Sequence, residues 1–140
     1  DIECSFDESW VQMITTSNDR KLNLLESALS SAKSSMVKEN IRVCHNDIGH
    51  LQYQSGNLQE ALKSYLRTRD FCSMARHNNE MCLNVIKVSL DLNQFFNANN
   101  FIDKVVDDCG DALVISKLKV ASGLVDLRDS RFKQAASKLL

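Results

Sequence analysis

Proline is absent from this 140-residue sequence, and only four glycines occur. Average usage of about 5% would give roughly seven prolines in a chain of this length. Proline lacks an amide hydrogen and glycine has a freer backbone, so these two residues interrupt helices most strongly. Their scarcity predicts a chain that is helical throughout.

An excess of charge of one sign is also absent, because 17 basic and 18 acidic residues give a formal charge of −1. This balance gives no electrostatic reason to expect nucleic acid or an anionic membrane as a partner. No apolar run approaches the ~20 residues that span a bilayer, and the acidic, polar opening "DIECSFDESW" does not have the pattern of a signal peptide. The sequence starts without Met and stops at "ASKLL" inside an expected helix, so we expect a fragment of a longer protein.

The cysteines show no pattern of a redox or catalytic site. Their number is odd and no close CxxC pair occurs, so we expect reduced thiols that pack as small hydrophobic residues in an intracellular protein. A nucleophilic thiol would need a base and an electropositive pocket, and the sequence supplies neither. The five cysteines are Cys4, Cys44, Cys72, Cys82 and Cys109.

Metal-binding patterns are lacking as well. His45 and His50 are five residues apart, which places them on divergent helix faces, whereas zinc-binding pairs prefer a spacing of four. His77 lies near an expected helix start with no partner in view. The acidic run Asp107–Asp111 lacks the alternating ligands of a calcium loop, so we expect a connecting loop in which Asp111 caps the next helix. We therefore predict no catalytic residue, metal, cofactor or small-molecule substrate.

The sequence does contain an internal repeat. Three alanines lie 37 residues apart, each with a large apolar residue three positions earlier and a turn-forming residue five positions earlier. Self-similarity with a period of about 20–50 residues is typical of solenoid proteins. The alanines are Ala61, Ala98 and Ala135, the apolar residues Leu58, Phe95 and Phe132, and the turn residues Gly56, Asn93 and Ser130.

Each repeat unit has the pattern of a helical hairpin. In the first unit, apolar residues at helical spacing predict a helix that ends at Gly56, a plausible left-handed terminator. Asn57 then begins a second helix, with Glu60 completing a variant of the capping box. Turns at Asn93-Gln94 and Asp129-Ser130 predict two further hairpins. The apolar faces of the first unit are Ile41, Cys44, Ile48 and Leu51, followed by Leu58, Ala61, Leu62, Tyr65 and Cys72.

The small residues are expected where the two helices of a hairpin cross closely. Gly49 and Gly123 would serve this purpose on the first helix, and the repeated alanine on the second. The large apolar residues Leu58, Phe95 and Phe132 are expected to pack the start of the second helix onto the first. A single hairpin cannot bury its own apolar face, so the units must stack. We predict an all-α fold, a right-handed superhelical array of antiparallel helical hairpins. The offsets of Gly49, Gly56, Ala61 and Tyr65 resemble the tetratricopeptide repeat, although the period is 37 residues and not 34, and the terminal proline is missing.

The first part of the chain does not share the repeat. We expect N-terminal helices in residues 1–36 and the tetratricopeptide-like repeats in residues 37–140. One helix is predicted from Glu8 to about Thr15, followed by a break at the cap-forming residues 16–19. A second apolar series follows from Leu22 to Ala32, with serines on its solvent side.

A protein partner is the ligand that such an array would bind. The candidate interaction residues lie off the expected apolar stripes of the first hairpin, where they could face a groove or meet an acidic partner. The alternative is that these residues are simply solvated, because acidic residues are distributed through the same chain. The candidates are Arg42, His45, Gln52, Lys63 and Arg67.

Several segments together resemble a known family. "VKENIRVCHNDIGHLQYQSGNLQEALKSYLRTRDFC", "NEMCLNVIKVSL" and "SKLKVASGLVDLRDSRFKQAASKLL" are similar, in this order, to the helical-repeat region of the family of subunit one of the COP-nine signalosome. Residues 9–42 resemble the segment that precedes this region. A related lid subunit of the proteasome regulatory particle shares the architecture and is the alternative, although "YLRTRDFC" and "NEMCLNVIKVS" look closer to the signalosome subunit.

The resemblance implies a non-catalytic scaffold arm in a nuclear and cytoplasmic complex. That complex removes a ubiquitin-like modifier from cullin-based ubiquitin ligases, and its zinc isopeptidase lies in a different subunit. The implied partners are other signalosome subunits and cullin-RING ligase components. A C-terminal PCI domain, which assembles the complex, would lie outside this chain. An enzyme domain and a free-standing peptide-binding adaptor are the competing functions.

Overall fold

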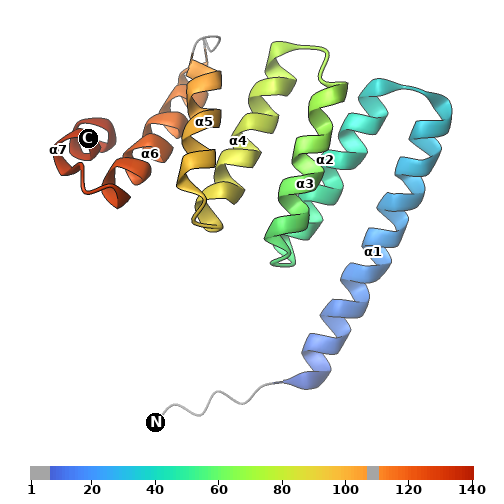
Figure 1. Cartoon of the computed structure of the whole chain (residues 1–140). Coiled ribbons are helices and arrows are strands. Elements are labelled where there is room, and N and C mark those ends of the chain that lie inside the picture. Colours follow the sequence, from blue (N-terminus) through green and yellow to red (C-terminus); the bar gives the residue numbers. More distant parts are fainter. Residues whose placement is uncertain (1–6, 107–110) are drawn as a thin grey trace.

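The computed structural model describes residues 7–106 and 111–140, and these residues form an array of helices without a strand (Figure 1). The predicted all-α repeat fold is confirmed. The cysteines Cys4 and Cys109 and the predicted loop 107–110 lie outside the described residues. The elements are α1 (Glu8–Ser35), α2 (Lys38–Gln54), α3 (Leu58–Thr68), a short 3₁₀ helix η1 (Arg69–Phe71), α4 (Ala75–Asp91), α5 (Phe95–Val106), α6 (Ala112–Arg128) and α7 (Phe132–Leu139).

Consecutive helices pair as antiparallel hairpins, α2 with α3, α4 with α5 and α6 with α7. All three turns are built in the same way. Gly56, Asn93 and Ser130 have φ angles of 79°, 58° and 59°, so each places a left-handed residue just after the first helix. The next backbone N–H then donates to a carbonyl five residues earlier, which satisfies an otherwise free helix end. These bonds join Asn57 to Gln52 (2.9 Å), Gln94 to Ser89 (2.8 Å) and Arg131 to Asp126 (2.9 Å).

The predicted close crossings are confirmed. Ala61, Ala98 and Ala135 are each 0% exposed. A Cβ atom added to Gly49 would lie 2.7 Å from the Cε1 atom of Tyr65, so the glycine lets that ring pack against α2. Each hairpin is therefore closed by small residues at positions that recur along the sequence.

The hydrophobic core runs along the array and is centred on α4, which packs against α3, α5 and α6. Val85 and Val88 of this helix are fully buried. Cys82 is also buried and unpaired, as expected for a thiol that packs as a small hydrophobic residue. The central hairpin thus contributes apolar side chains to both of its neighbours.

The predicted break near residue 16 is wrong, because α1 continues from Glu8 to Ser35. Serine, threonine and asparagine cost a helix only a few tenths of a kcal/mol each, and neither proline nor glycine interrupts this segment. The hydroxyl of Thr16 donates to the carbonyl of Gln12 within the helix (2.8 Å). The second half of α1 lies beside α2, while its first half extends beyond the other helices (Figure 1).

Two local predictions also fail. Asn57 occupies the position before α3, but its side chain makes no capping hydrogen bond, and Glu60 pairs with Lys63 instead. Phe132 was expected to pack against α6, yet it is 65% exposed. The predicted cap at Asp111 is confirmed, since its carboxylate accepts from the N–H of Leu113 (2.9 Å). The proposed division of the chain at residues 36 and 37 stays a prediction.

Candidate protein-interaction surface

Arg42 is not the surface residue that the sequence suggested. Its side chain is 10% exposed and lies between the carboxylates of Glu39 and Glu80. The guanidinium donates to Glu39 through Nη2 (2.7 Å) and Nε (3.1 Å), and Nη1 lies 3.4 Å from Glu80 of α4. These hydrogen bonds from Arg42 lower the pKa of Glu39. Arg42 therefore joins α2 to α4 and is not free to meet a partner.

His45 is also buried, at 4% exposure. Its ring stacks on Phe71 of η1 with centroids 6.0 Å apart. Burial lowers the pKa of His45, and the positive charges of Lys33 and Arg67 lower it further. The neutral imidazole is thus favoured, and the expectation that His45 faces an open groove is wrong.

Gln52 has a structural contact inside the first hairpin. Its side-chain oxygen accepts a hydrogen bond from the hydroxyl of Ser64 (2.7 Å), which couples α2 to α3. Equivalent positions in the next hairpins also carry polar links, from Asn97 to Ser89 (3.1 Å) and from Lys138 to Asp126 (2.6 Å). The residue that looked like a contact for a partner therefore belongs to a repeated polar link within each hairpin.

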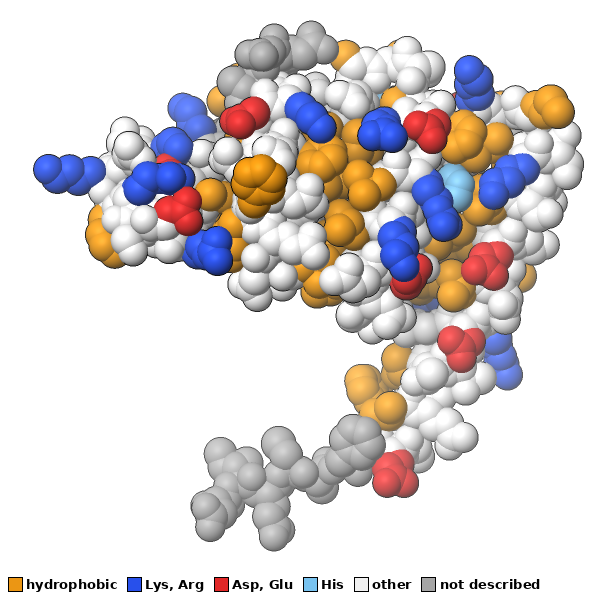
Figure 2. Space-filling view, in the orientation of Figure 1, with side chains coloured by type: hydrophobic (Ala, Val, Ile, Leu, Met, Phe, Trp, Pro, Cys, Tyr) orange, Lys and Arg blue, Asp and Glu red, His pale blue; other side chains and the backbone are white. Residues whose placement is uncertain are grey.

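Lys63 and Arg67 do lie on the surface of α3. Lys63 forms an ion pair with Glu60 (2.6 Å), in which both side chains are more than half exposed. Figure 2 shows Lys and Arg side chains gathered over this part of the array. Of the five candidates, these two are exposed, Gln52 is partly buried, and Arg42 and His45 are buried.

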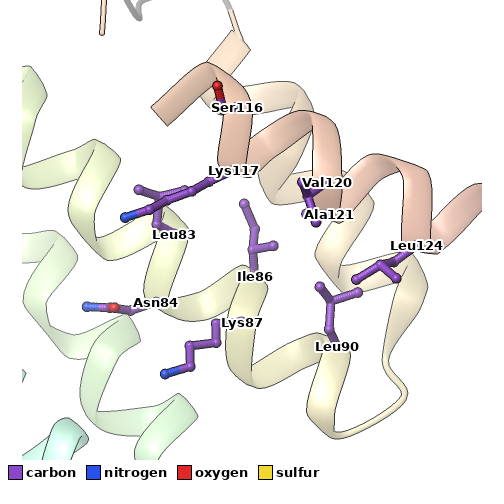
Figure 3. Close-up of a pocket in the computed structure, with 10 residues that line it drawn as sticks. All are labelled: Leu83, Asn84, Ile86, Lys87, Leu90, Ser116, Lys117, Val120, Ala121 and Leu124. Carbon is purple, nitrogen blue, oxygen red and sulfur yellow. The ribbon is translucent and has the colours of Figure 1, made fainter. Parts of the chain in front are cut away.

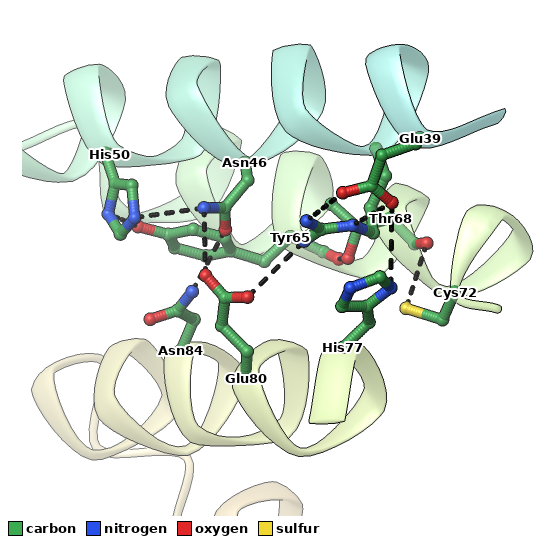
Figure 4. A network of polar contacts seen from close by, with 10 residues as sticks. Glu39, Asn46, His50, Tyr65, Thr68, Cys72, His77, Glu80 and Asn84 are labelled. Atoms are coloured by element: carbon green, nitrogen blue, oxygen red, sulfur yellow. Dashed lines mark hydrogen bonds and ion pairs between the residues drawn. The ribbon is translucent and has the colours of Figure 1, made fainter. Parts of the chain in front are cut away.

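A polar network between α2 and α4 was not predicted. The side chain of Asn84 donates to Asn46 (3.1 Å), and the Asn46 amide reaches Glu80 (3.4 Å) (Figure 4). Further along, the hydroxyl of Tyr53 donates to Asp91 (2.6 Å). Arg42–Glu80, Asn46–Asn84 and Tyr53–Asp91 are all separated by 38 residues. The repeat is 37 residues long, so each pair joins positions that are one residue out of register with the repeat. Complementary polar residues at this spacing are the sequence signal that could have revealed the network.

Two histidines contact residues of this region. His77 is buried at the start of α4, and its Nδ1, 3.6 Å from a Glu39 oxygen, makes no hydrogen bond within the described residues. The hydroxyl of Tyr65 lies 2.8 Å from Nδ1 of His50. Burial raises the pKa of Tyr65 to about 12, so the phenol stays protonated at neutral pH. These contacts join neighbouring helices to one another.

The next interface along the array is open and apolar. A hollow of about 560 Å³ lies between α4 and α6. Figure 3 shows leucine, isoleucine and valine side chains of the two helices directed toward it. Lys87 and Lys117 are the charged residues of its wall. This α4–α6 groove is the second surface on which a partner could bind.

The thiols of Cys72 and Cys82 offer little nucleophilic character. Burial raises the pKa of Cys72 and of Cys82, which disfavours the reactive thiolate. Across residues 7–106 and 111–140, no group of three or more metal-ligating side chains comes together. The helices in that same part of the chain include none with the length and apolar character to cross a bilayer.

Comparison with known proteins gives relatives along nearly the whole chain. COP9 signalosome complex subunit 1 of Arabidopsis thaliana is 36% identical over 136 residues, which cover 96% of this chain and 31% of that protein. Subunit 1b of Drosophila melanogaster is 35% identical, covering 97% of this chain and 27% of the relative. The Emericella nidulans subunit 1 is 26% identical over 99% of this chain and 28% of the relative.

This chain thus spans less than a third of the length of these curated relatives. A family model with the description "26S proteasome subunit RPN7" matches residues 7–140, which is nearly all of the chain. The two comparisons agree with the family that the sequence resembled and with its related proteasome subunit. The chain therefore belongs to the RPN7 family, and its curated homologues are named COP9 signalosome complex subunit 1.

Proposed function

We propose that this chain is the helical-repeat arm of a COP9 signalosome subunit 1 and that it works by binding protein and not by catalysis. The observation that carries the proposal is the 36% identity to the Arabidopsis protein of that name over 96% of the chain. The proposed partners are other signalosome subunits and cullin-RING ligase components, in the nucleus and cytoplasm. Its role would be to position partners while the removal of the ubiquitin-like modifier occurs elsewhere in the complex.

The architecture supports a binding role. Stacked hairpins present an extended surface, because each repeat adds another strip of exposed helix. The α3 surface offers Lys63 and Arg67, whose long side chains are accessible. Exposed charges of this kind steer association more than they stabilise a fold. A partner with an acidic surface fits these two residues.

The test of the assembly uses the full-length protein carrying an affinity tag at its native expression level. Purification followed by mass spectrometry should recover signalosome subunits in stoichiometric amounts. Depletion of the protein should raise the fraction of cullin that carries the modifier. Recovery of no stable complex would favour a free-standing adaptor and refute the proposal.

A proteasome lid subunit is the second candidate, because the matching family model has a proteasome subunit in its description. The same purification separates the two functions, since each complex has its own set of subunits. Proteasome lid subunits in place of signalosome subunits would establish the second candidate.

Charge reversal tests the α3 surface. Lys63→Glu with Arg67→Glu should leave the unfolding midpoint nearly unchanged, because exposed ion pairs contribute about 0–1 kcal/mol. The double variant should bind the purified partner complex more slowly, and its binding should depend less on salt than that of the wild type. The exposed pair Arg20 and Lys21 of α1, reversed in the same way, is the control. Unchanged association rate and salt dependence would show that Lys63 and Arg67 are only solvated.

A further inference from the structure

We propose that the α4–α6 groove binds an acidic amphipathic helix of a partner protein. This inference deepens the proposed protein-binding role and rests on it. The groove is lined by Leu83 and Leu90 of α4, by Val120 and Leu124 of α6, and by Lys87 and Lys117 at its edge (Figure 3).

The walls of the groove include exposed apolar side chains. Val120 and Leu124 are 50% and 42% exposed, and they lie one helical turn apart on α6. Leu83 and Leu90 face the same hollow from α4 and are partly exposed. A contiguous apolar strip bounded by polar residues is typical of a protein-binding surface.

The dimensions fit a helix. The apolar residues of α4 run from Leu83 to Leu90, seven residues apart, and a helical rise of 1.5 Å per residue makes this about 10.5 Å. Helices that bind in grooves present anchors at positions i, i+3 or i+4, and i+7, which cover the same length. The hollow of about 560 Å³ has room for several large side chains from such a helix.

The charge of the groove indicates which charged residues the bound helix would carry beside its apolar face. Lys87 and Lys117 line it, and no acidic residue does. In Figure 3 both ammonium groups lie on the same side of the groove in this view, the side of Asn84. The Lys87 amine lies 3.9 Å from the ring centroid of Tyr53 of α2, so it is directed toward α2, and Lys117 is the lysine on the α6 wall of the groove. A helix with glutamates along one flank of its apolar face would place a carboxylate next to Lys117.

The probe is a fluorescein-labelled, end-capped peptide with leucines at i, i+4 and i+7 and glutamates on one flank. Two matched peptides carry the same composition in scrambled order, or lysines in place of the glutamates. Binding to the full-length protein is measured by fluorescence anisotropy at two salt concentrations. The acidic helix should bind, the scrambled and basic peptides should bind at least about tenfold more weakly, and added salt should weaken the complex.

Protein variants locate the site. Val120→Asp should reduce affinity at least about tenfold, because a carboxylate would enter the apolar wall and repel the peptide. Lys117→Glu should reduce it several-fold, while Lys119→Glu, two residues along the same helix and outside this groove, should not. All three positions are exposed, so thermal unfolding should be unaffected and confirms that each variant is folded.

Several outcomes would overturn the inference. Equal losses for Lys117→Glu and Lys119→Glu would mean a general charge effect, and equal binding of the scrambled peptide would mean that no helix is recognised. Self-association of the protein that Val120→Asp abolishes would identify a second copy as the occupant. Absence of peptide binding to a protein that still purifies with signalosome subunits would refute the groove alone and leave the proposed function standing.

Discussion

The α2–α4 interface and the α4–α6 groove occupy the same place in successive repeats. Polar side chains form hydrogen bonds across the first, whereas the second contains a hollow lined mainly by apolar side chains. Asn46 and Asn84 form a hydrogen bond across the first interface. One repeat later the corresponding residues are Leu83 and Ala121, both of which line the hollow. The short alanine leaves space where Asn84 fills it in the preceding repeat.

The ends of the two interfaces differ in the same way. Tyr53 donates to Asp91 between α2 and α4, whereas the corresponding residues one repeat later are Leu90 and Arg128. The Arg128 guanidinium lies 4.8 Å from the ring centroid of Phe95 and so is directed to α5. The turns and the alanine crossings recur from repeat to repeat, whereas the side chains that face the next hairpin differ and leave the second interface open.

Removal of Arg42 should have the largest effect on the closed interface. Arg42→Ala deletes the hydrogen bonds to Glu39 and Glu80 and exposes the space that the buried side chain fills. Hydrogen bonds to charged groups contribute about 1.5–3 kcal/mol, and we expect a loss of this size in the free energy of unfolding from chemical denaturation. Lys117→Ala at the edge of the open groove should change it by less than about 0.5 kcal/mol. Similar losses for the two variants would contradict the difference between the interfaces.

Inside the hairpins, by contrast, the first two repeats should respond alike. Ala61→Leu and Ala98→Leu each insert a large side chain at a fully buried helix crossing. Overpacking of this kind costs about 1–3 kcal/mol, so both variants should lower the melting temperature by similar amounts. Lys63→Leu, two residues away and exposed, is the control and should change it little. An equal shift for Lys63→Leu would mean that the repeat register is wrong.

The features that sequence reasoning predicted correctly are set by local backbone geometry. A left-handed turn residue and a small residue five positions later are required in every hairpin, so they recur at Gly56 and Ala61 and again at Asn93 and Ala98. The failed break near residue 16 shows the limit of local signals. Residues that often cap helices are tolerated inside one when no stronger interruption is present and part of the helix packs against α2.

The burial of Arg42 and His45 could not be read from their own helix. Both lie off the apolar stripe of α2, which makes them look exposed. Their partners come from elsewhere, Glu80 from α4 and Phe71 from η1. The direction in which neighbouring hairpins pack therefore decides whether an off-stripe residue is a surface charge or part of an interface.

A smaller effect is expected at the far end of the closed interface. Tyr53→Phe removes the hydroxyl that donates to Asp91 at 2.6 Å. A hydrogen bond contributes about 0.5–1.5 kcal/mol to stability, and we expect the lower end because the contact is exposed. A double-mutant cycle with Asp91→Asn measures the coupling. A coupling energy of zero would show that this pair does not help to close the interface.

The last comparison is between hairpins, and its readout is the pH dependence of stability. The polar link between paired helices is uncharged at Gln52 and Ser89, but in the third hairpin it is the carboxylate of Asp126. This side chain is 4% exposed and lies 2.6 Å from the Lys138 amine and 2.7 Å from the Arg131 guanidinium. Hydrogen bonds from Lys138 and then from Arg131 lower the pKa of Asp126.

A lowered pKa makes this contribution to stability depend on pH. The carboxylate stabilises the fold above the ordinary aspartate pKa of about 4, and the contribution is lost as the pH falls through the lower folded-state value. Asp126→Asn should therefore weaken the fall in denaturation midpoint on acidification below about pH 4. Asp47→Asn, exposed on α2, serves as the control and should leave the pH profile of the wild type in place. Identical profiles for the two variants would show that the charged link of the third hairpin stabilises it no more than the neutral links of the first two.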